Sequence, residues 1–283
     1  MEAGVCPSAA GIFQLLLRPM PGNNWPLGMI VPIQDETPFS PFAPADWRTA
    51  LRKVKAVGYD GVELAITDPT KLSPTEIKEA LAQEGLHFFS ITTGQAAAKE
   101  GLSLSSPDDG VRRRAIARIQ AHMRLAQEFD AVVIIGSLRG ADGSIDLLVE
   151  SLRECAGYQP EVKLALEPLN RYESRLINTV EQARAVIEKV GADNLGILFD
   201  TFHANIEEVS ISKAIRTAGD RLFHVHLADS NRFVPGYGHL DFGEVWRALA
   251  EIGYRGALVL EPLPRPNPET LLAAAARLKG EIG

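Results

Sequence analysis

Cysteine is scarce in this sequence: the 283 residues include only Cys6 and Cys155. The two lie far apart and have no CxxC spacing, so the chain has neither a disulfide framework nor a cysteine motif for zinc. We therefore expect a cytoplasmic protein, kept in a reducing compartment. Long apolar runs are also lacking, because none approaches the roughly 20 residues that a transmembrane helix needs, and we expect no association with a membrane.

An excess of positive charge is lacking as well. The formal net charge is −7, with 29 Lys and Arg against 36 Asp and Glu, and like charges form no block. A nucleic-acid-binding face needs clustered Lys and Arg to contact phosphates, so we expect no nucleic-acid partner. The chain also has neither GxGxxG nor GxxxxGKS/T, the glycine-rich loops that bind dinucleotide and nucleotide phosphates.

What the sequence does contain is a regular alternation of strand and helix patterns. Short runs rich in Val, Ile and Leu predict strands, and amphipathic stretches between them predict helices. With 46% hydrophobic residues and no linker between units, eight such units predict a single closed (β/α)8 TIM barrel, a fold that typically takes about 250 residues. The expected strands lie at 28–34, 61–66, 86–94 and 131–136 and within 162–168, 195–203, 222–232 and 256–264, and the clearest helices at 44–58, 73–85, 106–130, 144–158, 179–191 and 241–253.

The first 27 residues do not fit this alternation. GIFQLLL (11–17) is a short apolar patch, yet no basic region precedes it and no clear small-residue cleavage site follows, which argues against a secretory signal. A stretch rich in Pro, Gly and Asn then interrupts any regular structure. We expect residues 1–27 to be an N-terminal extension, or a segment read from a start codon upstream of Met29, and residues 28–283 to be the barrel domain.

Four polar residues stand where the last four expected strands end: Glu167, Asp200, His226 and Glu261. They follow one another at intervals of 33, 26 and 35 residues, about one strand–helix unit each. Because parallel strands align their carboxyl ends on one face of a barrel, we expect these side chains to converge there. Three carboxylates and one imidazole suit a hard or borderline divalent cation. We expect one cation per chain, Mn²⁺ first, with Mg²⁺ or Co²⁺ as alternatives.

Such a site could act on a hydroxy-ketone. A cation that holds two adjacent oxygens of the substrate polarises the carbonyl and acidifies the neighbouring C–H. Glu167 and Glu261 follow strands on different sides of the barrel mouth, so one could remove a proton from a carbon and the other return it to the opposite face. We therefore expect both residues to be catalytic acid/bases as well as metal ligands.

At these residues the sequence resembles a known family. LEPLNRYE, LFDTFHANIEE, HVHLADSNR and LEPLP are similar to the ketose 3-epimerases of the xylose-isomerase-like barrels, the group of D-tagatose and D-psicose 3-epimerases. Within that group, GYDGVELAITDP, TTGQAAAKEGLSLSSPD, VVIIGSLRG and NRFVPGYGHLDF most resemble 5-keto-L-gluconate epimerases, which act on keto-uronic acids. The resemblance runs from about Gly28 to Leu278 and implies a sugar or sugar-acid substrate.

The resemblance also implies roles for individual residues. Glu167, Asp200, His226 and Glu261 match the family's metal ligands, and the two glutamates match its acid/base pair, which moves the C3 proton through a cis-enediolate. Positions that hold the O1 to O3 end of the substrate are matched by Glu173, His203 and Arg232. The sequence does not fix the oligomeric state, and a homodimer or a homotetramer would both be compatible with it.

Two further residues carry separate expectations. Arg139 follows the fourth strand, so its guanidinium should reach the rim of the mouth, where it could bind the acid group of a keto-uronate bidentately; the alternative is an exposed loop arginine. His224 is expected to point away from His226 and to have a packing role.

Other activities of similar barrels remain open. A decarboxylase of a branched 3-oxo sugar acid would also use an enediolate, and a hydroxypyruvate-type or aldose–ketose isomerase would use the same two carboxylates. A three-metal repair endonuclease is disfavoured, because the ends of the second and third strands read Ala65–Ile66 and Thr92–Thr93 instead of supplying extra histidines. A sugar-binding barrel without catalysis would not need two carboxylates around one carbon.

Overall fold

The computed structural model describes residues 24–282 and confirms the expected barrel. Eight parallel strands form a closed sheet in chain order, and the ring is completed where Leu27, Gly28 and Met29 pair with the last strand. The strands are β1 (Leu27–Pro32), β2 (Gly61–Ala65), β3 (His87–Thr92), β4 (Val132–Ile135), β5 (Leu164–Leu166), β6 (Leu195–Asp200), β7 (Leu222–Leu227) and β8 (Leu258–Leu260).

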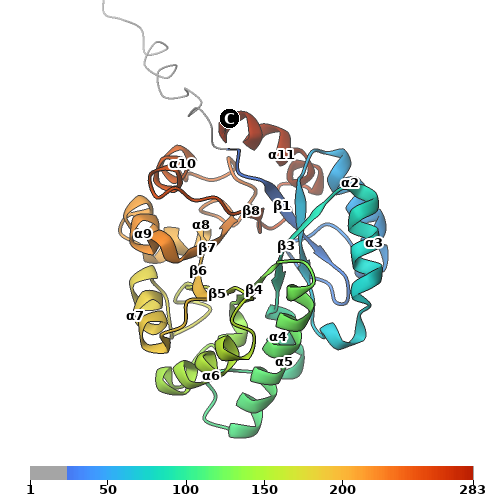
Figure 1. Cartoon of the computed structure of the whole chain (residues 1–283). Coiled ribbons are helices and arrows are strands. Elements are labelled where there is room, and N and C mark those ends of the chain that lie inside the picture. The colour runs from blue at the N-terminus through green and yellow to red at the C-terminus, as the bar shows by residue number, and fades with distance from the viewer. Residues whose placement is uncertain (1–23, 283) are drawn as a thin grey trace, which may run out of the picture.

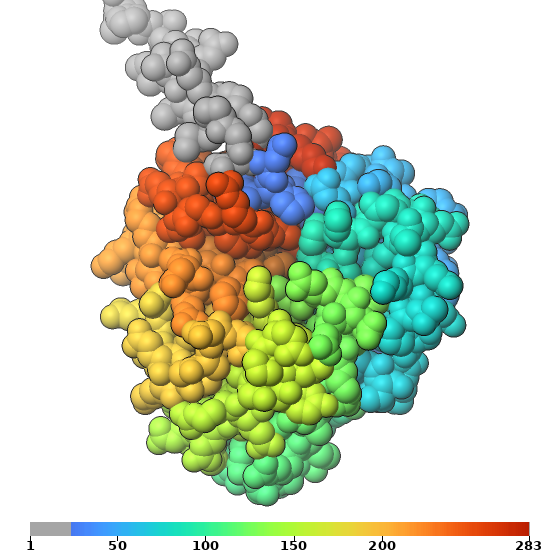
Figure 2. Space-filling view, in the orientation of Figure 1, coloured from blue at the N-terminus to red at the C-terminus, as the bar shows by residue number. Residues whose placement is uncertain are grey.

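Helices surround this sheet, and the colour runs around the ring in chain order, so that α11 lies beside the first units (Figures 1 and 2). The Tyr59 hydroxyl joins the two ends of the ring by donating to the carbonyl of Leu271 at 2.6 Å. The helices are α2 (Trp47–Ala56), α3 (Pro74–Glu84), α4 (Gly94–Glu100), α5 (Asp109–Gln127), α6 (Ile145–Tyr158), α7 (Val180–Val190), α8 (Thr201–Glu207), α9 (Ile211–Ala218), α10 (Phe242–Glu251) and α11 (Pro268–Ile282).

Helix boundaries follow local capping chemistry. Thr179 and Gln182 form a full capping box at the start of α7, and Gly85 ends α3 in the left-handed conformation that glycine adopts at low cost. Helix α5 begins at Asp109, later than the expected start at 106, because Asp108 accepts the free amides at its start. The Ser106 hydroxyl instead accepts from the amide of Asp108, two residues before the helix could use it as a cap.

Two other details differ from the sequence expectations. None of the helices expected from the sequence covers the segment after β3, and part of it forms the short helix α4. Packing into the barrel also begins before Gly28: Trp25 is 5% exposed, and its indole donates to the carbonyl of Tyr254 at 2.8 Å. Residues 1–23, most of the expected extension, lie outside the described residues.

Among residues 24–282, no helix combines the length and the apolar character that crossing a membrane requires. The described chain buries most of its apolar side chains in one large cluster between the strands and the surrounding helices, and two smaller apolar clusters accompany it. The barrel interior, by contrast, contains a set of fully buried polar side chains, contributed by β2, β3 and β7. These lie directly behind the candidate site.

Candidate active site

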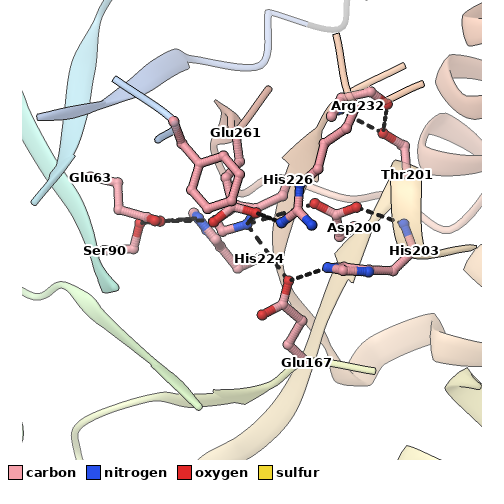
Figure 3. Close-up of polar contacts among 12 residues, drawn as sticks. Glu63, Ser90, Glu167, Asp200, Thr201, His203, His224, His226, Arg232 and Glu261 are labelled. Atoms are coloured by element: carbon pink, nitrogen blue, oxygen red, sulfur yellow. Dashed lines mark hydrogen bonds and ion pairs between the residues drawn. The ribbon is translucent and has the colours of Figure 1, made fainter. Parts of the chain in front are cut away.

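The four expected metal ligands meet at one end of the barrel (Figure 3). Glu167 and Glu261 directly follow β5 and β8, Asp200 is the last residue of β6, and His226 lies within β7. All four are buried, and each offers one oxygen or nitrogen atom within 4.8 Å of those of the others. The structure thus assembles these residues from four strands, as the sequence predicts, while their role as ligands stays a prediction.

His226 faces the three carboxylates with Nδ1. This atom lies 3.3 Å from Glu261 Oε2. It also lies 3.9 Å from Glu167 Oε1 and 4.0 Å from Asp200 Oδ2. Among the described residues, neither His226 Nδ1 nor Glu167 Oε1 has a hydrogen-bond partner, although both atoms are buried. Buried polar atoms without partners are costly, and a divalent cation among these ligands would satisfy both. The donor set therefore fits a cation.

The electrostatics of the cluster agree with this fit. Burial, and then the negative charges of Glu261 and Asp200, raise the pKa of Glu167 well above its ordinary value. Burial and the charge of Glu261 likewise raise the pKa of Asp200 to about 6. Burial would lower the pKa of His226, but its acidic neighbours raise it well above its usual range. Concentrated negative charge is the condition that a bound cation relieves.

Local backbone structure fixes two of the carboxylates. Asp200 is the N-cap of α8, and its Oδ1 accepts from the backbone N–H of His203 at 2.9 Å. Glu167 lies against Gly136, the residue directly after β4. A Cβ at Gly136 would come within 2.5 Å of Glu167 Oε2, so a side chain there would displace this carboxylate from its present position.

A pocket of about 280 Å³ opens over the cluster. Its walls combine the two glutamates with side chains of the neighbouring loops: Glu36, Thr37, Pro38, Phe39, Thr92, Gly94, Gln95, Ala98, Lys99, Gly136, Ser137, Glu167, Leu169, Glu173, His203, Arg232 and Glu261. The three residues expected to hold the substrate (Glu173, His203 and Arg232) are all in this lining. A volume of this size suits a small ligand.

His203 presents a hydrogen-bond donor to the pocket. Its Nδ1 accepts from the backbone N–H of Asn170 at 3.2 Å and from the side-chain amide at 2.8 Å. A backbone N–H can only donate, so a neutral His203 carries its proton on Nε2. Burial and the positive charges of Arg232 and Arg139 lower the pKa of His203 to about 2, which keeps the ring neutral. Nε2, 3.8 Å from Glu167 Oε1, can therefore donate to a substrate oxygen.

Arg232 is held above the carboxylates by two kinds of contact. Its guanidinium donates to Glu173 Oε1 at 2.7 Å and lies 3.6 Å from Glu261 Oε2. The rings of Phe39 and Phe202 lie 4.5 and 4.8 Å from it, distances at which a cation is attracted to an aromatic face. Arg232 also has a φ of +61°, an uncommon conformation for a residue with a side chain, so the loop after β7 constrains its direction.

The structure corrects the expected place of Arg139. Its side chain is fully buried, and its guanidinium donates to the backbone carbonyls of Glu167 and Ile177 instead of reaching the rim. Burial lowers the pKa of Arg139 to about 10, and the residue is absent from the pocket lining. The arginine therefore supports the backbone that carries Glu167, and the expected position of Arg139 at the rim is wrong.

The expected orientation of His224 is also wrong. Residues two apart on a strand project to the same face, and His224 enters the barrel interior beside His226, with ring centroids 5.3 Å apart. There both imidazoles meet Glu63 of β2, which the sequence analysis did not single out. The sequence did contain a sign of Glu63, because GVELAI (61–66) places this carboxylate in the middle of an apolar strand.

Comparisons with known proteins agree with this geometry. A family model described as xylose isomerase-like TIM barrel matches residues 51–280. The D-psicose 3-epimerase of Ruminiclostridium cellulolyticum is 36% identical over 234 residues, 78% of this chain and 80% of that protein. The 3-dehydro-D-guloside 4-epimerase of Escherichia coli is 38% identical over 127 residues, 44% of this chain and 48% of that protein. A crystal structure of D-psicose 3-epimerase with D-tagatose from Clostridium cellulolyticum H10 is 33% identical, with a TM-score of 0.72 over 85% of this chain and 86% of that one.

The family resemblance seen in the sequence is thereby confirmed. These relatives are named carbohydrate epimerases, and epimerases are isomerases, so the expected enzyme class is confirmed too. The narrower resemblance to 5-keto-L-gluconate epimerases stays a prediction. The match over most of the chain shows that this protein belongs to the xylose isomerase-like TIM barrel family.

Proposed function

We propose that the protein is a divalent-metal-dependent 3-epimerase of a ketose. The observation that carries this proposal is the pair Glu167 and Glu261, which reach one buried centre from β5 and β8 and share it with Asp200 and His226. Removing a proton from one face of a carbon and returning one to the opposite face requires a carboxylate on each side of that carbon. The relatives named D-psicose 3-epimerase support the choice of C3.

Each residue has a defined task in this scheme. Glu167, Asp200, His226 and Glu261 would hold the cation, which when bound supplies Lewis-acid polarisation of the substrate carbonyl. One glutamate removes the proton from the carbon beside the carbonyl and leaves an enediolate, and the other returns a proton to the opposite face. Burial and its acidic neighbours raise the pKa of Glu167, which is the direction that favours uptake of a proton by this carboxylate.

The remaining side chains orient the sugar. His203 donates from Nε2 to a substrate oxygen, and Arg232 with Glu173 binds the hydroxyl groups at the same end. Phe39 covers the guanidinium of Arg232 and forms part of the pocket wall. These residues orient the reacting carbon between the two glutamates, and orientation of this kind supplies a large part of an enzyme's rate.

The charge of the pocket favours a neutral sugar over a keto-uronate. Among the described lining residues, the cationic side chains are Lys99 and Arg232. Lys99 lies 3.1 Å from Asp35, and Arg232 lies 2.7 Å from Glu173. Each cation is therefore already paired with an acid. With Arg139 buried behind the site, a substrate carboxylate would meet no free cation in this lining, so we propose a neutral ketose.

Deuterium incorporation tests the reaction directly. Metal-loaded protein is incubated in D₂O with neutral ketohexoses, keto-uronates and a 3-keto glycoside, and the products are followed by NMR and by CO₂ release. Label at C3 with inversion, fastest for a neutral ketose, is the expected result. Label at C1 would show an aldose–ketose isomerase, label at C4 of the glycoside a 4-epimerase, and released CO₂ a decarboxylase; each would replace the proposed reaction.

A further inference from the structure

A second polar cluster lies behind His226, on the side away from the three carboxylates (Figure 3). It consists of Glu63 of β2, Ser90 of β3 and the neighbouring His224 of β7, all at most 1% exposed. Glu63 Oε2 lies 3.0 Å from His226 Nε2. Strands β2 and β7 are not neighbours in the sheet, so this contact crosses the barrel interior.

The contact determines which ring nitrogen of His226 carries its proton. A carboxylate can only accept hydrogen bonds, so Nε2 must be the donor toward Glu63. A neutral imidazole has a single N–H, which leaves a lone pair on Nδ1. Nδ1 is the atom that faces Glu167, Asp200 and Glu261.

We propose that Glu63 is a positioning residue of the metal centre, which holds His226 in the Nε2–H tautomer and aims its Nδ1 lone pair at the cation. This inference rests on the metal site of the proposed function. Metal-binding histidines commonly donate their second N–H to a carboxylate, which fixes the ring orientation and increases the basicity of the ligand. Glu63 makes no contact with the pocket, so it acts only through His226.

The carboxylate itself is locked by its other neighbours. The Ser90 hydroxyl donates to Glu63 Oε2 at 2.5 Å, and His224 Nε2 lies 3.3 Å from the same oxygen and 3.0 Å from Ser90 Oγ. One oxygen thus receives three donors from two other strands. Such a network leaves Glu63 little freedom to turn away from His226.

The same residues could also be read as a second cation site, because Glu63, His224 and His226 offer ligand atoms within 4.8 Å of one another. The hydrogen bonding argues against this reading. His226 Nε2 cannot donate to Glu63 and bind a cation at the same time, and Glu63 Oε2, which lies within 3.3 Å of both imidazoles, already accepts from the Ser90 hydroxyl. Donors around a carboxylate fit a hydrogen-bond network, and we therefore expect no cation among Glu63, His224 and His226.

The test uses the full-length protein, Glu63→Gln, and Ser90→Ala as the matched control. Glutamine keeps the size of the side chain and removes its charge, while Ser90→Ala removes a partner of Glu63 and leaves Glu63 and His226 in place. Three quantities are measured: Mn²⁺ affinity by competition with a chelator, melting temperature in excess chelator, and the ¹⁵N and ¹H shifts of histidine side chains in protein loaded with diamagnetic Zn²⁺. Elemental analysis gives the number of ions per chain.

We expect one ion per chain and a protonated Nε2 on His226 in the loaded wild type. Glu63→Gln should lose about 10- to 100-fold in metal affinity, shift the His226 Nε2–H resonance, and still melt cooperatively in chelator. Ser90→Ala should lose only a few-fold. Unchanged affinity in Glu63→Gln, an equal loss in Ser90→Ala, a proton on Nδ1, or two ions per chain would each overturn the role of Glu63. A wild type that binds no metal would instead refute the proposed function.

Discussion

Replacement of Asp200 by asparagine should stabilise the metal-free protein while it removes metal binding. Asp200 has two roles that this change separates. Its Oδ1 caps α8 by accepting from the His203 backbone N–H, and asparagine caps a helix about as well as aspartate. Its charge, however, lies in a buried cluster with Glu167 and Glu261, and asparagine removes that charge.

The size of the effect follows from the pKa of Asp200. Burial and the charge of Glu261 raise this pKa from 3.8 to about 6. A carboxyl whose pKa is higher in the folded state destabilises the fold once it ionises, so the penalty is absent below pH 3.8 and complete above pH 6. A rise in pKa from 3.8 to about 6 corresponds to about 3 kcal/mol at pH 8. In a barrel of this size, that is a rise of several °C in melting temperature.

The assay compares urea denaturation of wild type and Asp200→Asn at pH 8 and pH 5, with excess chelator or with Mn²⁺. In chelator, the variant should be more stable, and its advantage should shrink at pH 5. With Mn²⁺ at about 100 times the dissociation constant, the wild type should gain about 2.7 kcal/mol and the variant little. Asp241→Asn, at the N-cap of α10, is the matched control. It should change neither the stability in chelator nor the gain in stability from Mn²⁺. An Asp200→Asn protein that is less stable than wild type in chelator, or that gains as much from Mn²⁺, would refute the reasoning.

Four further substitutions test other parts of the site. Glu167→Gln and Glu261→Gln should each lower kcat by at least about 10²-fold at saturating metal; near wild-type turnover of either metal-loaded variant would end the two-base scheme. Arg139→Ala should lower the free energy of unfolding by about 2–5 kcal/mol, because it leaves two buried carbonyls without a hydrogen-bond donor. Its KM values for neutral and acidic sugars should change by the same factor, and a selective rise for the acid would restore Arg139 as a binding residue. Gly136→Ala should weaken metal binding about tenfold or more, since its methyl group meets Glu167; Gly157→Ala, where a Cβ meets nothing within 4 Å, is the control, and equal affinity of both variants would contradict the argument.

The barrel and its four convergent residues were predictable because they depend on repetition. Each strand–helix unit carries its own apolar run, and the last four runs each end on a polar residue, so counting units predicts both the fold and the face on which Glu167, Asp200, His226 and Glu261 meet. The start of the helix expected at 73–85 was also predictable, because the hydroxyl of Ser73 accepts from the amide of Glu76 and so caps it.

Contacts across the barrel were not predictable in this way. Arg139 follows a strand and could have pointed to the rim, but the carbonyls of Glu167 and Ile177 bind its guanidinium in the interior. Glu63 and His226 are 163 residues apart and on strands that do not pair, so no local pattern joins them. Side chains two residues apart on a strand lie on the same face, which would have placed His224 beside His226. The expectation that His224 points away from His226 did not apply this rule.

The central claim is that one divalent cation binds between β5, β6, β7 and β8. Anomalous diffraction at the manganese edge, from crystals of the protein loaded with Mn²⁺, tests it most directly. We expect a single peak per chain, bonded to Glu167, Asp200, Glu261 and Nδ1 of His226, and no peak in crystals of Asp200→Asn grown under the same conditions. A peak at Glu63 and His224, or none in the wild type at saturating Mn²⁺, would contradict it.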